Sequence, residues 1–169
     1  MTTIDSDGQF AAFYRANYSV ILATVTRRLS DHATAEDVTS EVFRVAWAHH
    51  SGGETLTLPW LYTVARNVVG NEYRRSARSA ALTARTEDLD GVAHATTADV
   101  TEDDGARDTR RAMMRLKEAD REILFMAYWE DLSGAEIGAI LDLKLPTVWV
   151  RLNRARAALK QQLGREDER

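Results

Sequence analysis

The sequence predicts an all-α protein made of two small helical domains joined by a flexible acidic linker. Apolar residues recur at three- and four-residue spacing on both sides of the middle of the chain, and no stretch shows the alternation of a half-buried strand. Residues 81–108 carry a net charge of −6, although the whole chain of 169 residues carries only −4. This segment also lacks an apolar period, which indicates a linker. We place the domains at residues 7–78 and 109–164, with the linker at 79–108.

The N-terminal domain begins with two predicted helices. Aromatic and aliphatic residues spaced three and four apart predict the first helix over about residues 7–29. The second helix is expected over about residues 33–49. Either Asp31 opens it as the N-cap, or Thr34 and Asp37 form a capping box.

A third helix is expected to start at Pro59, because proline suits the first helical position, and to run to about Arg78. The C-terminal domain is expected to hold four helices, at about 107–118, 120–130, 133–141 and 146–163. Ser133 and Glu136 have the spacing of a capping box at the start of the third of these. A short helix, a tight turn and a longer basic helix together are typical of a helix-turn-helix.

The last helix has one apolar stripe and two polar flanks. At 100° per residue the stripe consists of Val148, Leu152, Ala155, Leu159 and Leu163. One flank holds Thr147, Arg151 and Arg154, and the other holds Trp149, Asn153, Arg156 and Lys160. Such flanks suit a helix inserted in the major groove, with cations near phosphates and side chains near base edges. An ordinary solvated amphipathic helix is the alternative.

The second and third helices each have a face that their core stripe does not explain. Opposite the valine stripe of the second helix lie Glu36, Ser40, Phe43 and Trp47, a mixture typical of a protein docking surface. Beside the core stripe of the third helix lie Trp60, Tyr62, Arg66, Asn67 and Arg74, a mixture that suits unpaired bases. In both helices the alternative is that a three-helix bundle buries the aromatic residues.

Several function classes are excluded by composition. The chain has no cysteine, and its four histidines are too scattered for a zinc site. Its acidic start differs from a signal peptide, and no apolar run approaches the ~18 residues of a membrane span. We therefore predict a cytoplasmic protein with no membrane insertion, no metal and no cofactor. The carboxylate pairs Glu36-Asp37 and Asp103-Asp104 are adjacent residues that point apart, so we predict no catalytic residue.

Three segments resemble the extracytoplasmic-function (ECF) group of the sigma-70 family, in order and in spacing. Residues 35–47, AEDVTSEVFRVAW, resemble the core-binding helix of sigma region two. Residues 59–67, PWLYTVARN, resemble the motif that opens the helix for the −10 promoter element, and residues 136–156 resemble the helix-turn-helix of region four. The resemblance implies a sigma factor, not an enzyme, that binds core RNA polymerase and directs promoter-specific transcription initiation.

The resemblance also implies a role for each matching position. The residues expected to bind the clamp helices of the polymerase β′ subunit are Asp37, Ser40, Glu41, Phe43, Arg44 and Trp47. Those expected to engage the melted −10 element, together with the loop at 49–57, are Trp60, Tyr62, Arg66, Asn67, Arg74 and Arg75. Those expected to contact the −35 element as duplex are Thr147, Trp149, Arg151, Asn153, Arg154 and Arg156. The implied partners are core RNA polymerase through its β′ and β subunits, promoter DNA and, as in many relatives, an anti-sigma factor.

A stand-alone helix-turn-helix regulator is the alternative function, because it shares the C-terminal motif. It gives no reason for the aromatic faces of the second and third helices, and polymerase binding distinguishes the two functions. The C-terminal domain also departs from the usual family pattern. Gly138 stands in place of alanine, Pro146 in place of glycine, and Trp149 and Val150 in place of lysine and serine.

Overall fold

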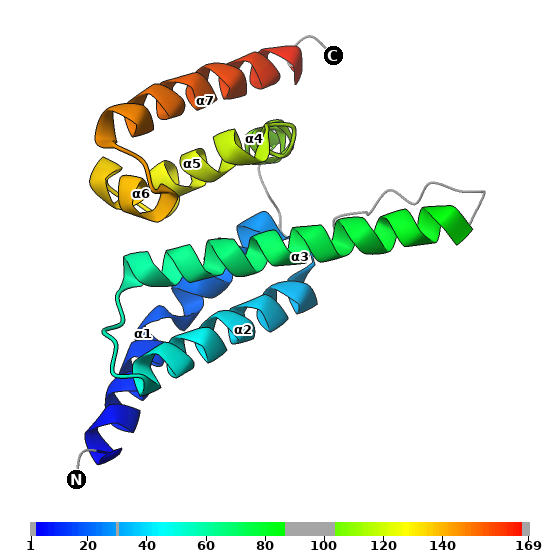
Figure 1. The fold of residues 1–169 in the computed structure, drawn as a ribbon. Coiled ribbons are helices and arrows are strands. Elements are labelled where there is room, and N and C mark those ends of the chain that lie inside the picture. The colour runs from blue at the N-terminus through cyan, green and yellow to red at the C-terminus, as the bar shows by residue number, and fades with distance from the viewer. Residues whose placement is uncertain (1–2, 30, 87–103, 167–169) are drawn as a thin grey trace. The chain divides into compact units, whose positions relative to one another are not determined.

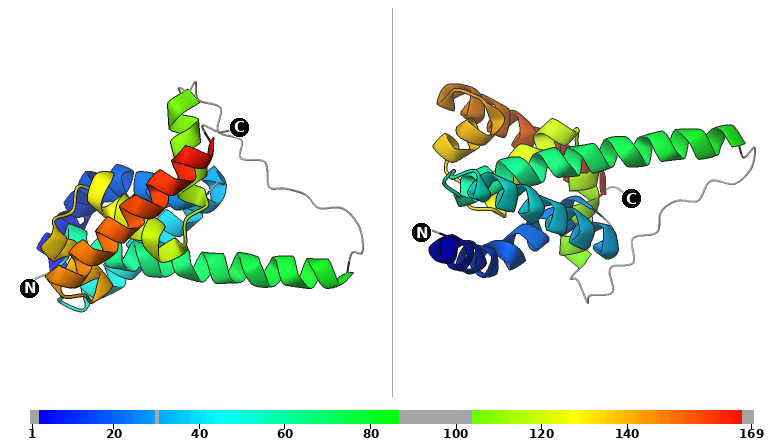
Figure 2. Two further views of the ribbon diagram at one scale, coloured as in Figure 1. Left: turned by 90° about the horizontal axis from the view of Figure 1, so that it is seen from above. Right: turned by 60° about the horizontal axis from the view of Figure 1, so that its bottom comes forward.

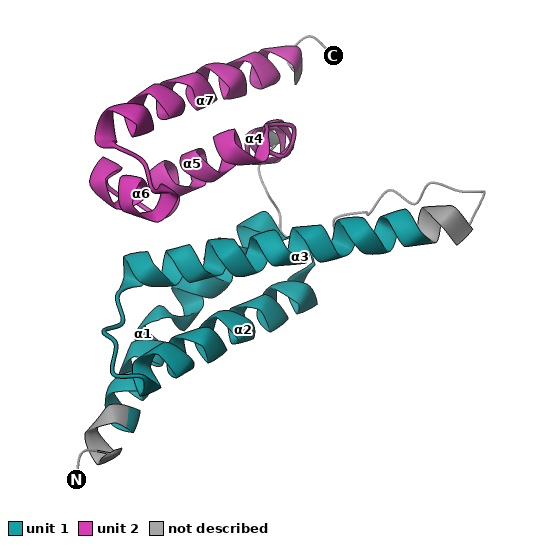
Figure 3. Cartoon of the chain, viewed as in Figure 1, with its two compact units in different colours: residues 1–98 teal, residues 99–169 magenta. Residues whose placement is uncertain are grey.

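A computed structural model describes residues 3–29, 31–86 and 104–166, which form seven helices and no strand (Figure 1). The chain divides into two compact units, residues 1–98 and 99–169 (Figure 3). Each unit buries an apolar core of its own. The prediction of an all-α protein with two helical lobes is therefore confirmed.

Unit 1 is a bundle of three helices, α1 (Thr3–Arg28), α2 (His32–Ser51) and α3 (Leu58–Thr86). Each helix packs against the other two. Tyr73 of α3 donates a hydrogen bond of 2.5 Å to the Arg28 carbonyl at the end of α1. The core of the bundle consists of Ile21, Val25, Leu29, Ala35, Val38, Val42, Phe43, Ala46, Leu61, Tyr62, Val64, Ala65 and Val69.

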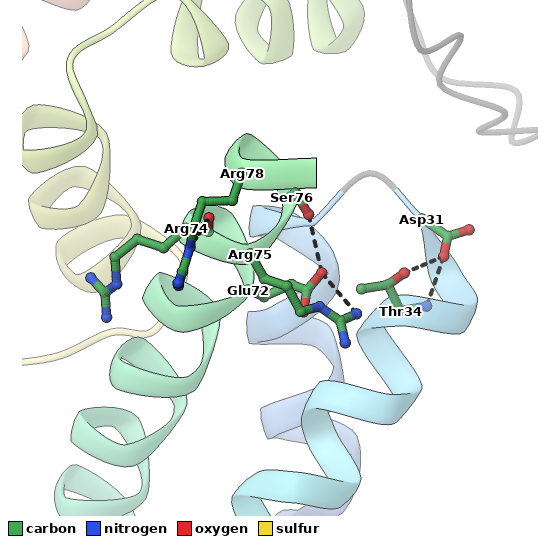
Figure 4. A network of polar contacts seen from close by, with 7 residues as sticks. All are labelled: Asp31, Thr34, Glu72, Arg74, Arg75, Ser76 and Arg78. Atoms are coloured by element: carbon green, nitrogen blue, oxygen red, sulfur yellow. Dashed lines mark hydrogen bonds and ion pairs between the residues drawn. The ribbon is translucent and has the colours of Figure 1, made fainter. Parts of the chain in front are cut away.

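The start of α2 is fixed by Asp31, one of the two openings that the sequence allowed. The Asp31 carboxylate accepts hydrogen bonds from the Thr34 hydroxyl at 2.6 Å and the Thr34 backbone N–H at 2.8 Å (Figure 4). These bonds hold the pKa of Asp31 below its ordinary value. The cap satisfies a backbone donor that the first turn of a helix leaves free.

The third helix is longer than predicted. It continues to Thr86 instead of ending near Arg78, and it projects past the ends of α1 and α2 (Figures 1 and 2). Side chains 77–82 are exposed. The acidic composition that predicted a linker over 79–108 therefore missed the helical residues at its two ends, since α4 also begins earlier, at Asp104. The middle of that linker, residues 87–103, lies outside the described residues.

Unit 2 contains four helices, α4 (Asp104–Met114), α5 (Glu118–Tyr128), α6 (Gly134–Leu141) and α7 (Leu145–Glu166). The long α7 packs against the other three helices, and α5 also packs against α6. The core of the unit consists of Ala112, Met113, Leu116, Ile123, Leu124, Phe125, Met126, Ile137, Ile140, Val148, Leu152 and Ala155.

Candidate functional site

One face of α2 presents polar and charged side chains to solvent. Asp37, Ser40 and Arg44 are exposed, and Glu41 is half-buried. Arg44 donates two hydrogen bonds to the Glu41 carboxylate, at 2.7 Å from Nε to Oε2 and 2.5 Å from Nη2 to Oε1. These bonds lower the pKa of Glu41 and raise the pKa of Arg44. Four of the six predicted polymerase-binding residues thus lie on one accessible face, two of them as an oriented ion pair.

Phe43, which the sequence placed on that docking surface, is buried with only 4% of its surface exposed. Its ring centroid lies 4.7 Å from that of Tyr14, edge-on, and 5.9 Å from that of Tyr18. Both tyrosines belong to α1, which packs along α2 and covers this position. Phe43 is therefore a core residue, and the alternative of a bundle that buries two faces of α2 is correct here.

Trp47, by contrast, is 41% exposed. Its ring meets Phe10 of α1 edge-on at a centroid distance of 4.8 Å, and its centroid lies 6.2 Å from that of His50. Phe10 and Tyr14 belong to the periodic pattern that predicted the first helix. Their i, i+4 spacing was a signal that the two rings share one side of α1.

The start of α3 holds the two aromatic candidates for base contact, and they differ in exposure. The Trp60 indole stacks on the His49 imidazole with a centroid distance of 4.2 Å and an interplanar angle of 16°. Histidine thus covers one face of a half-buried ring. Tyr62 is buried in the core. Its predicted place on a base-contacting face is corrected, because no base can reach a side chain inside the bundle.

The remaining candidates on α3, Arg66, Asn67, Arg74 and Arg75, are all exposed. Arg74 donates a hydrogen bond of 2.5 Å to the Asn71 side chain. Glu72 holds its neighbours on the same helix: its carboxylate lies 3.1 Å from Arg75 Nε and accepts from the Ser76 hydroxyl at 3.1 Å (Figure 4). The basic part of α3 is therefore ordered by short-range contacts and open to an anionic partner.

The helix-turn-helix of unit 2 begins with a complete capping box, as predicted. The Ser133 hydroxyl accepts from the Glu136 N–H at 3.2 Å, and the Glu136 carboxylate accepts from the Ser133 N–H at 2.8 Å. Hydrogen bonds from Ser133 hold the pKa of Glu136 below its ordinary value. The box fixes the first turn of α6.

The turn between α6 and α7 depends on two unusual positions. Asp142 has a φ of 53°, in the left-handed region that aspartate tolerates better than most residues. Gly138 lets the turn approach closely: a Cβ there would lie 2.7 Å from the Leu143 carbonyl oxygen. This contact explains why glycine occupies a position where the family pattern has alanine.

The long helix α7 buries a narrow stripe and leaves the rest in solvent. Val148, Leu152 and Ala155 are buried as predicted, whereas Leu159 and Leu163 are only half-buried. All six residues predicted to contact duplex DNA are exposed: Thr147, Trp149, Arg151, Asn153, Arg154 and Arg156. The structure therefore brings this whole set together on one helix.

Two of these arginines are held by α5, which the sequence gave no reason to expect. Arg154 Nη2 lies 3.6 Å from the Asp120 carboxylate. Arg156 donates a hydrogen bond from Nε to the Tyr128 hydroxyl, and its guanidinium carbon lies 5.5 Å from the centre of the Tyr128 ring. Contacts between residues this far apart in the chain leave no local pattern. They set the direction of two cations before any ligand arrives.

Trp149 also packs within the motif. A Cβ at Gly134 would lie 2.8 Å from Leu145 Cδ1 and 3.1 Å from Trp149 Cζ2, so both side chains cross the start of α6. Because 48% of the Trp149 surface is still exposed, this side chain joins α6 to α7 and keeps an open edge.

The described residues contain neither a cluster of metal ligands nor a membrane-spanning helix. No group of three or more potential metal ligands comes together over 3–29, 31–86 and 104–166. Within the same ranges, each helix is too short or too polar to cross a membrane.

Comparison with known proteins assigns both units. Residues 13–79 match the family model of sigma-70 region 2, and residues 106–159 match that of sigma-70 region 4. The first range contains the α2 face and most of α3, and the second contains the helix-turn-helix.

Two curated relatives cover nearly the whole chain. The chain is 34% identical over 162 residues to the ECF RNA polymerase sigma factor SigL of Mycobacterium tuberculosis, covering 90% of this chain and 89% of SigL. It is 31% identical over 168 residues to the RNA polymerase sigma factor YlaC of Bacillus subtilis, covering 92% and 94%.

Solved structures share the fold. The sigma factor RpoE of Bartonella quintana, solved with the anti-sigma factor NepR, matches with a TM-score of 0.71 at 23% identity, over 92% of this chain and 97% of RpoE. CnrH, solved with the cytosolic domain of CnrY, matches with a TM-score of 0.65 at 21% identity, over 94% and 89%.

Proposed function

This chain belongs to the ECF group of the sigma-70 family and directs transcription initiation with RNA polymerase, and from that premise we propose that its two units divide promoter recognition between them. Unit 1 binds core polymerase through α2 and engages the melted −10 element through α3. Unit 2 binds the −35 element as duplex through α7.

The observation that carries the proposal is the surface of α7. A narrow buried stripe holds the helix on its unit, and the exposed side presents Arg151, Arg154 and Arg156 next to two uncharged polar residues. The capping box fixes the start of α6, and the left-handed backbone conformation of Asp142 ends it in the tight turn that leads into α7. Such a helix fits the major groove, where arginines reach phosphates and guanine edges while the hydrogen-bonding side chains reach other bases.

Polymerase binding is assigned to the exposed part of the α2 face. Asp37, Ser40, Glu41, Arg44 and Trp47 supply charge-assisted hydrogen bonds and one large apolar side chain, the combination found at interface hot spots. Phe43 acts indirectly, because it is buried beneath Tyr14 and Tyr18 and holds α1 against α2.

Contact with the melted strand is assigned to the open surface of α3. Trp60 has one face covered by His49, so an unpaired base has only the other face on which to stack. Arg66 and Asn67 supply hydrogen bonds to base edges, and Arg74 and Arg75 supply charge for phosphates.

Core binding tests the assignment of unit 1. Purified chain is mixed with bacterial core RNA polymerase and followed by size exclusion. Trp47→Ala is expected to weaken binding by roughly tenfold, because truncating a tryptophan at the centre of an interface removes about 1–2 kcal/mol. Trp129→Ala is the matched control, since Trp129 of unit 2 is 42% exposed and has no assigned role. Equal binding by both variants would remove Trp47 from the interface.

Footprinting of the assembled holoenzyme tests the assignment of unit 2. Arg151→Ala is expected to lower discrimination for the −35 element by about 1–3 kcal/mol, the value of one bidentate base contact. Lys160→Ala, a cation near the far end of α7, is the control and should weaken binding to all sequences alike. An unchanged −35 footprint in the Arg151 variant contradicts the assignment.

An anti-sigma factor is a second proposed partner. The structures of RpoE and CnrH that share this fold were solved with NepR and with the cytosolic domain of CnrY. An inhibitor of this chain is expected to compete for the α2 face, so that Trp47→Ala weakens both complexes.

Binding of the chain to duplex DNA without binding to core polymerase would favour the alternative function, a stand-alone regulator.

A further inference from the structure

The most exposed large apolar side chain of α7 is Val150, with 68% of its surface in solvent. It lies two residues after the buried Val148 and two before the buried Leu152. At 100° per residue, Val150 points almost directly away from the buried stripe. It therefore occupies the outermost line of the helix.

Packing within unit 2 does not explain a valine there. An exposed β-branched residue in a helix gives up the favourable burial of its methyl groups and has a lower helix propensity than alanine. Trp149 and Leu145, the other exposed large apolar side chains of α7, both lie against Gly134 at the start of α6. Val150 instead points into solvent, beside Arg151 and Arg154.

The charge of the surroundings identifies the class of partner. Arg151, Arg154 and Asn153 flank Val150, and α7 carries no acidic residue before Glu166. An apolar tip between cations matches the major groove of duplex DNA, where phosphates line both edges and base edges form the floor. A protein partner that buried Val150 would also have to pair with Arg151, whereas Arg154 already lies 3.6 Å from the Asp120 carboxylate.

On the floor of the major groove only one base edge carries an alkyl group, the 5-methyl group of thymine. The isopropyl group of valine neither donates nor accepts a hydrogen bond, so it favours this methyl group over the polar edges of the other bases.

We propose that Val150 is a specificity-determining residue that contacts the 5-methyl group of a thymine in the −35 element. The inference rests on the proposed binding of unit 2 to duplex DNA and adds a base preference to it. Binding is expected to depend on that single methyl group as well as on hydrogen bonds from the arginines.

Replacing thymine by deoxyuridine deletes only the methyl group and therefore tests the contact. A −35 duplex is first selected from a random library by the holoenzyme. Each thymine is then changed to deoxyuridine in turn, and holoenzyme affinity is measured. At one position the unmodified protein is expected to lose about three- to fivefold in affinity, the effect of exposing one methyl-sized group.

Val150→Ala completes a double-mutant cycle with the modified DNA. The variant should bind the thymine duplex several-fold more weakly and should no longer distinguish thymine from deoxyuridine at that position. Val20→Ala is the matched control, because Val20 is an exposed valine of unit 1 and its loss should leave the discrimination intact.

The outcomes test the role of Val150 separately from the binding of unit 2 to duplex DNA. A −35 footprint that persists while no deoxyuridine substitution matters overturns the role of Val150 and leaves unit 2 as the duplex-binding unit. Absence of any −35 footprint overturns the proposed binding of unit 2 to duplex DNA. Weaker assembly of the Val150→Ala variant with core polymerase, with thymine discrimination unchanged, would assign the residue to a protein contact instead.

Discussion

Unit 1 buries part of its candidate site, whereas unit 2 leaves its candidate site in solvent. Phe43 and Tyr62 are core residues of the three-helix bundle, although their helices carry exposed polar candidates as well. On α7 the predicted set is exposed throughout. The difference lies in how many faces each helix buries. On α2 and α3 the bundle buries Phe43 and Tyr62 in addition to the core stripe, whereas α7 buries a single stripe although it packs against three helices. An aromatic residue on a second face of a helix therefore predicts an exposed position less reliably than a cation outside a single apolar stripe does.

Truncating one apolar residue in each unit tests this difference in burial most directly. Phe43→Ala is expected to lower the free energy of unfolding of unit 1 by about 3–5 kcal/mol, since it leaves a cavity between α1 and α2. Val150→Ala removes an exposed side chain and should change the stability of unit 2 by no more than about 0.5 kcal/mol. Chemical denaturation followed by circular dichroism measures both. Similar values for the two variants would show that exposure does not separate the two sites.

One glycine in each unit allows the same comparison for substitutions next to the backbone. Gly138→Ala in α6 is expected to destabilise unit 2 by about 1–3 kcal/mol, because the new Cβ would lie 2.7 Å from a carbonyl oxygen. Gly70→Ala in α3 meets only the Arg74 guanidinium, at 3.8 Å. It should stabilise unit 1 by up to about 1 kcal/mol through helix propensity. Thermal melts of the two variants should shift in opposite directions, and shifts of the same sign contradict the geometry of the turn.

The smallest effect concerns pH, and it acts on both units through their helix caps. The folded pKa values of Asp31 and Glu136 lie below the ordinary values of 3.8 and 4.5. Their contribution to stability is therefore present at neutral pH and is lost as pH falls through the lowered values. Asp31→Asn and Glu136→Gln keep a capping group that does not titrate.

An acid titration of stability checks this prediction. Each variant should show a shallower loss of stability below about pH 4.5 than the unmodified chain, the Asp31 variant in unit 1 and the Glu136 variant in unit 2. An acid limb as steep as that of the unmodified chain would mean that the cap does not contribute.

Local patterns predicted much of this molecule from its sequence. The number of helices in the described residues, the capping box at Ser133 and the tight turn before the last helix all follow from residue preferences over a few positions. The exposed set on α7 could be predicted too, because one apolar stripe on a helix fixes which residues face outward.

Features that depend on contacts distant in sequence could not be predicted. The burial of Phe43 requires knowing that α1 lies over that face of α2. The contact of Arg154 with Asp120 joins residues on two helices with no shared pattern. The end of α3 was missed for a different reason: charge indicated a linker, while the alanine- and arginine-rich residues 77–86 have high helix propensity.

The projecting end of α3 can change the length of chain that leaves unit 1. The side chains of residues 77–82 are exposed, so little burial stabilises this part of the helix, and its backbone hydrogen bonds open more easily than those near the buried Leu61. Each residue rises about 1.5 Å in a helix but can extend to about 3.3–3.6 Å when released. Unwinding from Thr86 backward therefore adds roughly 2 Å of reach per residue. The end of α3 can therefore lengthen the connecting chain by unwinding, while the core of unit 1 stays intact.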